Sequence, residues 1–178
     1  MLTTRRHSRR TAGTALVVAA LMLLLAAPAG AQGPPQTGSG EAIVTFIDPP
    51  PPEPGDRVDL GNSGNWRQTR TLTGDIIDGP LGGGSFEQTV TGVVRTDANF
   101  VTYHGTMTVE SPAEDPFKDL CDGVDTITLG VTGRGQAAPP VTEASVHVID
   151  SSPGDVTGRG TVTQVGESLT YDIQYICR

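Results

Sequence analysis

The feature of this sequence that most constrains its fold is a repeated alternation of apolar and polar side chains with a period of two residues. It is clearest at the C-terminus, where one face would carry Leu169, Tyr171, Ile173, Tyr175 and Cys177, and the other Thr170, Asp172 and Gln174. A period of two with one apolar face is typical of antiparallel strands that bury one side. The pattern therefore predicts a sheet protein without helices.

The same alternation recurs upstream, and glycine interrupts it about every ten to fifteen residues, as expected for short strands joined by turns. We predict eight strands, at residues 41–47, 66–77, 85–95, 99–110, 124–133, 143–149, 158–165 and 168–177. Eight antiparallel strands can close into a barrel that leaves no free edges. The predicted fold class is therefore all-β, an eight-stranded antiparallel β-barrel.

Residues 1–31 have the three parts of a secretory signal peptide. Four arginines lie within residues 5–10, residues 11–27 are uncharged and mainly apolar, and Ala29-Gly30-Ala31 gives the small-residue pattern that a signal peptidase accepts. The apolar run is shorter than the roughly 20 residues that a membrane-spanning helix needs, so we favour cleavage over an anchor. The paired arginines leave Sec and Tat export open. We predict a secreted protein with no membrane attachment after cleavage.

The remaining stretch, about 147 residues, fits one domain. Residues 32–40 (QGPPQTGSG) are polar and rich in proline and glycine, so we predict a flexible linker there and the β-barrel domain at 41–178. The proline-rich run at 49–54 is predicted to be an extended link outside the hydrogen-bonded sheet.

The domain is strongly acidic. All twenty Asp and Glu follow residue 31, and eight of the twelve Lys and Arg remain after the leader, which gives a net charge of −12. Nucleic acids and anionic membranes are bound mainly through Lys and Arg that neutralise phosphate, so neither is an expected partner. An acidic surface favours solubility and is compatible with cations, basic proteins or neutral ligands.

The domain contains two cysteines, Cys121 and Cys177. An even pair in an oxidising compartment usually forms a disulfide, and closing this loop would stabilise the fold by about 4 kcal/mol in the chain-entropy model. A metal-binding or catalytic thiol is the alternative, but neither cysteine has a His or Cys near it in sequence. We favour the disulfide.

The alternation also predicts which polar side chains face the interior. Trp66 and Leu72 suggest that their shared face is inward, which would place Gln68 and Arg70 inside. A concave apolar site with a few polar groups is the usual form of a small-ligand pocket, and Arg70 could hold a carboxylate or enolate. The candidate ligand-binding residues are Trp66, Gln68, Arg70, Gln88, Tyr103, Tyr171 and Tyr175. The alternative is that Arg70 is solvated or ion-paired at the mouth and that the tyrosines fill the core; one bulge would also reverse the face.

No motif indicates a catalytic or metal site, and we predict no metal and no cofactor. His104 and His147 fall on Thr/Ser-rich faces and are predicted to be exposed. The Gly-Arg-Gly tripeptides at 133–135 and 158–160 are predicted to be turns or bulges. For the acidic loop 114–125 we favour a solvated loop over a calcium site, because its spacing differs from that of an EF-hand and Lys118 interrupts it.

The segment 145–161 (SVHVIDSSPGDVTGRGT), with 91–94, 104–107 and 171–177, has a layout of glycine-spaced hairpins. It resembles bacterial proteins with an allene oxide cyclase-like barrel, many of which are secreted and without assigned function. The resemblance covers roughly residues 66–178 and implies a barrel similar in shape to those of plant dirigent proteins and allene oxide cyclase, in a group that is often oligomeric. No residue matches those proteins' catalytic positions, so only the fold is carried over.

Two functions follow as hypotheses. The first is a non-enzymatic secreted module that binds a small apolar or aromatic ligand or acts through its surface. The second is a cofactor-independent isomerase or cyclase of the allene oxide cyclase or dirigent type, which would act mainly by positioning a reactive intermediate. An enzyme would need a cavity faced by Arg70, Tyr103 or another titratable group, whereas a packed interior would leave surface roles.

Overall fold

The computed structural model describes residues 33–48, 57–61, 64–112, 116–117, 120–121, 123–137, 140–152 and 156–177. The predicted signal peptide and the proline-rich run at 49–54 lie outside them. The strands are β1 (Gln36–Asp48), β2 (Val58–Asp59), β3 (Trp66–Ile76), β4 (Ser85–Arg95), β5 (Phe100–Glu110), β6 (Thr126–Ala137), β7 (Pro140–Ser152), β8 (Val156–Val165) and β9 (Ser168–Cys177). Among these residues no helix is long and apolar enough to cross a membrane.

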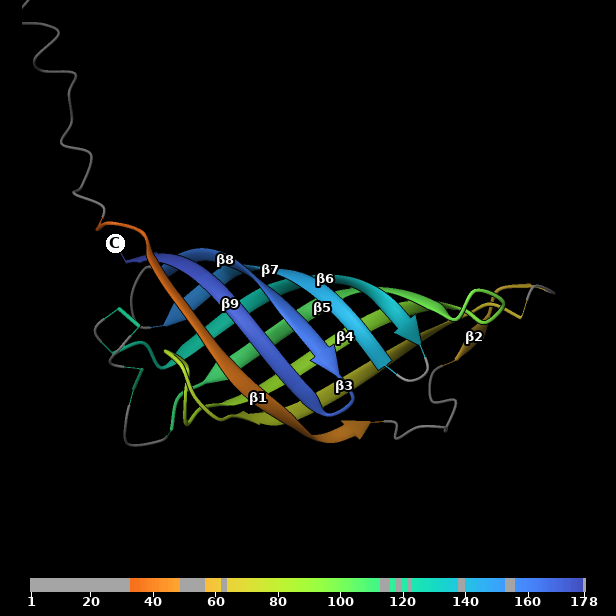
Figure 1. Cartoon of the computed structure of the whole chain (residues 1–178), viewed down its shortest axis with the longest axis horizontal. Helices are drawn as coiled ribbons and strands as arrows, with labels where there is room; N and C mark the ends of the chain where they lie inside the picture. The colour runs from red at the N-terminus through yellow and green to blue at the C-terminus, as the bar shows by residue number, and fades with distance from the viewer. Residues whose placement is uncertain are drawn as a thin grey trace, which may run out of the picture. The chain divides into compact units, whose positions relative to one another are not determined.

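The strands form one antiparallel sheet that closes on itself (Figure 1). From β3 to β9 each strand pairs with the next in sequence, and β1 joins the two ends. The first part of β1, up to Ile43, pairs with β9, and the part from Ala42 onward pairs with β3. The register of the pairing with β3 shifts between Val44 and Phe46, an irregularity of the kind that a β-bulge produces. The predicted all-β, antiparallel class is confirmed; we call the closed part, β1 with β3–β9, the ring.

The predicted bounds of β4 and β9 are confirmed, and those of β3 and β5 differ by one residue. The short strand β2, which pairs with the start of β3, was not predicted.

The prediction of a linker over residues 32–40 is wrong for Gln36–Gly40, which belong to β1. Polar, glycine-rich residues suit this part of β1 because a Cβ at Gly38 would collide with the Pro80 ring, and one at Gly40 with the Tyr171 hydroxyl. Close packing, rather than flexibility, accounts for these glycines.

The prediction that the two Gly-Arg-Gly tripeptides are turns or bulges is also wrong, because they lie inside β6 and β8. The glycines leave room for large side chains on neighbouring strands. A Cβ at Gly133 would meet the Tyr103 ring, and one at Gly160 would come within 2.9 Å of Ile173. The arginines between the glycines, Arg134 and Arg159, are exposed.

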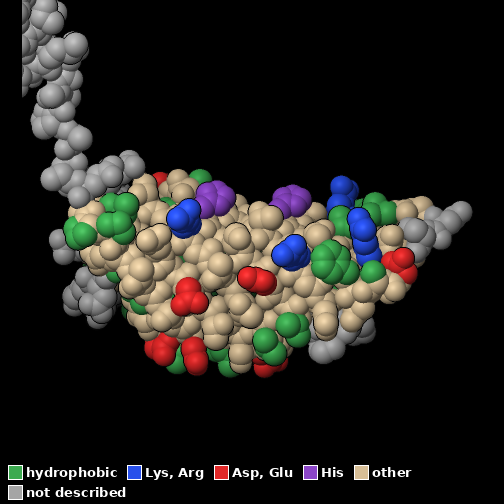
Figure 2. Space-filling model, turned by 45° about the horizontal axis from the view of Figure 1, so that its top comes forward, with side chains coloured by type: hydrophobic (Ala, Val, Ile, Leu, Met, Phe, Trp, Pro, Cys, Tyr) green, Lys and Arg blue, Asp and Glu red, His purple; other side chains and the backbone are tan. Residues whose placement is uncertain are grey.

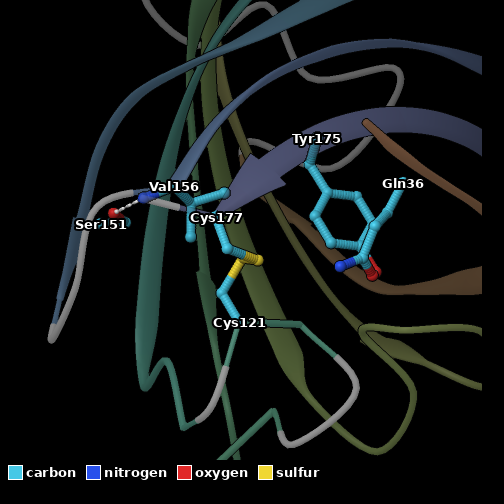
Figure 3. Close-up of a disulfide and its surroundings, with 6 residues drawn as sticks. All are labelled: Gln36, Cys121, Ser151, Val156, Tyr175 and Cys177. Carbon is cyan, nitrogen blue, oxygen red and sulfur yellow. Dashed lines mark hydrogen bonds between the residues drawn. A yellow bond between two sulfur atoms is a disulfide. The ribbon is translucent and has the colours of Figure 1, made fainter. Parts of the chain in front are cut away.

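One end of the ring is filled by apolar side chains from the connection between β5 and β6. Phe117, Leu120 and Val124 are at most 4% exposed, and Phe117 and Val124 form a β-bridge. Cys121, beside Leu120, forms a disulfide with Cys177 at the end of β9, with a Cα–Cα distance of 5.3 Å (Figure 3). The predicted disulfide is confirmed, and it ties this connection to the sheet. We call this the disulfide end and the opposite one the far end.

Candidate ligand-binding site

Polar side chains point into the ring near the far end. Gln68 and Arg70 come from the first half of β3, Tyr103 from the start of β5 and Thr142 from the start of β7. Gln68 and Thr142 are buried, and Arg70 and Tyr103 are half-buried. Inward side chains at alternate positions of neighbouring strands meet inside a closed sheet, so this end has a polar interior.

Arg70 and Gln68 form one side of this region. The Arg70 Nε–H donates to the Gln68 Oε1 at 3.1 Å. No described carboxylate forms an ion pair with Arg70. Burial lowers the pKa of Arg70 below its ordinary value, but a guanidinium remains charged in proteins. The interior therefore holds a cation with no described anion beside it.

Gln88 lies deeper in the ring, opposite Leu72 of β3, and is diagonal to Arg70 in the sheet. It is 9% exposed. Its amide forms no hydrogen bond to the described residues, and its polar atoms are not fully enclosed by the protein. Because a buried amide normally needs a partner, a polar group within the ring would find one here.

Tyr103 faces Gln68 across Gly92, which pairs with both residues and has no side chain between them. Its hydroxyl donates to the Thr142 Oγ1 at 3.1 Å. Burial raises the pKa of Tyr103, an effect that this hydrogen bond partly offsets. Tyr103 is therefore neutral near pH 7 and can donate or accept a hydrogen bond, but it is poorly suited to act as a base.

Trp66 lies at the far end itself and is half-buried. The guanidinium of Arg57, next to β2, lies over its ring at 5.1 Å from the centroid, within the range of a cation–π contact. Trp66 therefore borders the polar interior from the rim of the ring.

The hydroxyls of Tyr171 and Tyr175 form hydrogen bonds within the protein. The Tyr171 hydroxyl donates to the Asp78 carbonyl oxygen at 2.7 Å and accepts from the Leu81 amide at 3.4 Å. The Tyr175 hydroxyl donates to the Gln36 Oε1 at 3.1 Å, and the two side chains lie side by side in Figure 3. These bonds hold the turn after β3 and the start of β1.

The apolar interior nearer the disulfide end leaves little space. A cavity bordered by Leu81, Val109, Leu120 and other apolar side chains has a volume of about 30 Å³. This is room for about one water molecule, whereas small-ligand pockets measure roughly 300–1,000 Å³. The apolar region is therefore too small for such a ligand, and the candidate site rests on the polar side chains near the far end.

The remaining predicted features lie outside the ring or outside the described residues. His104 and His147 are exposed, as predicted. The described residues contain no group of His, Cys, Asp and Glu that could hold a metal ion, and most carboxylates of the acidic loop 114–125 lie outside the described part of the chain.

Sequence reasoning missed one site residue, Thr142. The predicted strand at 143–149 begins one residue too late to include it, whereas β7 begins at Pro140. The alternation itself would have found it, because Thr142 shares its face with Ala144 and Val146, which are both buried.

No family model, curated protein or solved structure matches this chain. The resemblance to allene oxide cyclase-like barrels therefore stays a prediction.

Proposed function

We propose that this chain is an exported, non-enzymatic binding protein whose ring holds a small aromatic or apolar acid, with the ligand's carboxylate at Arg70. Arg70 carries the proposal, because it is a half-buried, inward cation with an amide as its described partner. A carboxylate can accept two parallel hydrogen bonds from a guanidinium, and Gln88 offers a further donor.

The proposal includes export through a signal peptide at residues 1–31 and an allene oxide cyclase-like barrel as the fold. The Cys121–Cys177 disulfide supports export, because disulfides persist mainly in oxidising compartments. The closed eight-stranded ring supports the barrel.

Binding is better supported than the alternative, an isomerase or cyclase. Such an enzyme could use the same interior to position an intermediate, but a general base should have a pKa near the working pH. The pKa of Tyr103 moves away from neutrality, and Arg70 keeps its proton. The inward groups of the far end therefore suit recognition of a negative charge.

Calorimetric titration with benzoate, and with benzyl alcohol as its uncharged analogue, tests the proposal. The unmodified protein should bind benzoate at least about ten-fold more tightly, because a hydrogen bond to a charged group contributes roughly 1.5–3 kcal/mol. Arg70→Gln should remove this preference. Arg95→Gln is the matched control, because Arg95 carries the same charge and is exposed on β4.

Two results would refute the Arg70 site. One is benzoate binding to Arg70→Gln as tightly as to the unmodified protein. The other is equal affinity of the unmodified protein for benzoate and benzyl alcohol. Thermal melts of both variants would show whether either substitution unfolds the ring.

A further inference from the structure

The outer face of the ring has a feature that the interior site does not use, a groove that crosses the strands. One hollow, of about 660 Å³, lies over β1, β7, β8 and β9, and a second, of about 520 Å³, lies over β3 to β7. Both are bordered by Ser145 of β7. We call the two together the transverse groove.

The floor of the transverse groove is a row of small polar side chains that pair across the sheet. In strand order from β4 to β9 and then β1, the row consists of Thr91, His104, Thr132, Ser145, Thr161, Asp172 and Ser39. Neighbouring strands lie about 4.8 Å apart, so polar groups recur at that spacing around the ring. Hydroxyls both donate and accept hydrogen bonds, which suits a partner rich in hydroxyl groups.

The side chains that border the groove carry more positive than negative charges, whereas the whole chain is acidic. Three arginines border it, Arg67, Arg134 and Arg159, against two carboxylates, Glu143 and Asp172. The whole sequence has 12 basic and 20 acidic residues. Figure 2 shows basic and histidine side chains on the upper part of one face, and carboxylates in the middle of that face and along its lower edge.

These arginines are not neutralised by described acidic groups. Arg134 stands directly opposite Glu143 in the pairing of β6 with β7, yet the two form no ion pair. Arg159 stands opposite His147, a second basic side chain. Three guanidinium groups are thus available to negative charges of a partner.

The spacing of the arginines indicates the size of that partner. Arg67 and Arg134 lie in one row, three strands apart, which is about 14 Å around the ring. Arg159 lies two strands beyond Arg134, so the three span about 24 Å or more. A small anion could contact one of them, whereas an extended polyanion could contact all three.

We propose that the transverse groove binds an acidic polysaccharide, a chain that carries a carboxylate on its sugar units. Such a chain combines the hydroxyls that the Thr and Ser row can bind with the regular negative charge that the arginines can bind. Single-stranded nucleic acid fits less well, because it relies on stacking of bases on aromatic side chains. Of the described groove residues Tyr103 points into the ring, which leaves the imidazole of His104 as the aromatic group on the groove surface.

Binding of the full chain to polygalacturonate, measured by calorimetry at low salt, tests this proposal. Dextran serves as the neutral polysaccharide and a single-stranded oligonucleotide as the other polyanion. We expect polygalacturonate to bind, its affinity to fall with added salt, and dextran and the oligonucleotide to bind more weakly.

The double variant Arg134→Gln/Arg159→Gln should weaken binding by about 2-fold to 30-fold, the range expected for the loss of two exposed ion pairs. The control variant Arg95→Gln removes an exposed charge outside the groove and should change affinity by less than about two-fold. Equal losses in both variants, no binding of polygalacturonate, or tighter binding of dextran or the oligonucleotide would overturn the proposal. The affinity of the groove variant for benzoate distinguishes this site from the one at Arg70, because substitutions in the groove should leave benzoate binding unchanged.

Discussion

At the scale of single residues, polar side chains in the ring fall into two groups. Some, such as Tyr171, are hydrogen-bonded to the protein, whereas Arg70 and Gln88 are incompletely satisfied. Alternation in the sequence predicted that all of these side chains face inward. It could not predict their hydrogen bonds, because partners such as those of Tyr171 lie 90 or more residues away in the sequence, in the turn after β3.

Removing the Tyr171 hydroxyl should destabilise the fold. Tyr171→Phe leaves the Asp78 carbonyl and the Leu81 amide without this partner, and an unsatisfied buried polar group costs about 1–3 kcal/mol. The free energy of unfolding, measured by urea titration, should fall by that amount. A variant as stable as the unmodified protein would show that the turn after β3 does not depend on this hydroxyl.

Tyr171 should also make stability depend on alkaline pH. Burial raises the pKa of Tyr171 to about 12 from its ordinary value of 10.0. The folded state thus favours the neutral phenol, so its contribution is complete below pH 10 and is lost as the pH rises from 10 towards 12. The melting temperature of the unmodified protein should fall over this interval, and that of Tyr171→Phe should fall less. Equal slopes would contradict the assignment.

At the scale of strands, the glycines of the two Gly-Arg-Gly tripeptides, for which the sequence predicted turns or bulges, are sites of close packing. Gly133 lies under the Tyr103 ring within β6, and Gly92 lies beside the same residue in β4 with more space. Sequence alone could not distinguish these roles, because glycine marks turns and close approaches alike. The strands themselves were predictable where one face was mostly apolar, as in β4 and β9.

A pair of glycine substitutions tests this packing. Gly133→Ala would place a methyl group against the Tyr103 ring and should destabilise the fold by about 1–3 kcal/mol. At Gly92 the nearest atoms are 3.4 Å from an added Cβ, so Gly92→Ala should cost less. Urea titrations that show equal losses, or a greater loss for Gly92→Ala, would contradict the packing.

The disulfide should be a major source of stability for the β5–β6 connection. Cys121 and Cys177 are 56 residues apart, and opening a loop of that size should cost about 4 kcal/mol in the chain-entropy model. The double variant Cys121→Ser/Cys177→Ser should show this loss in urea titration. A loss below about 1 kcal/mol would indicate that packing of Leu120 and Phe117 holds the connection without the bond.

At the scale of the whole molecule, closure of the ring depends on β1, a strand that the sequence predicted only in part. Its first part pairs with β9 and its last part with β3. Gln36–Gly40 lack the apolar alternation that identifies a strand, because their glycines pack against Pro80 and Tyr171. The candidate site was predicted only in part for the same reason. The local alternation predicts which side chains face inward, but which of these side chains meet at one end depends on how the ring closes.

The central claim, an exported protein that holds a small acid at Arg70, is tested most directly by native mass spectrometry of protein recovered from the culture medium of its own host. The claim predicts a chain without residues 1–31, a mass lower by two hydrogens for the disulfide, and a retained small organic acid that is absent from Arg70→Gln. Protein recovered without any bound molecule, or with the same molecule on Arg70→Gln, would contradict it.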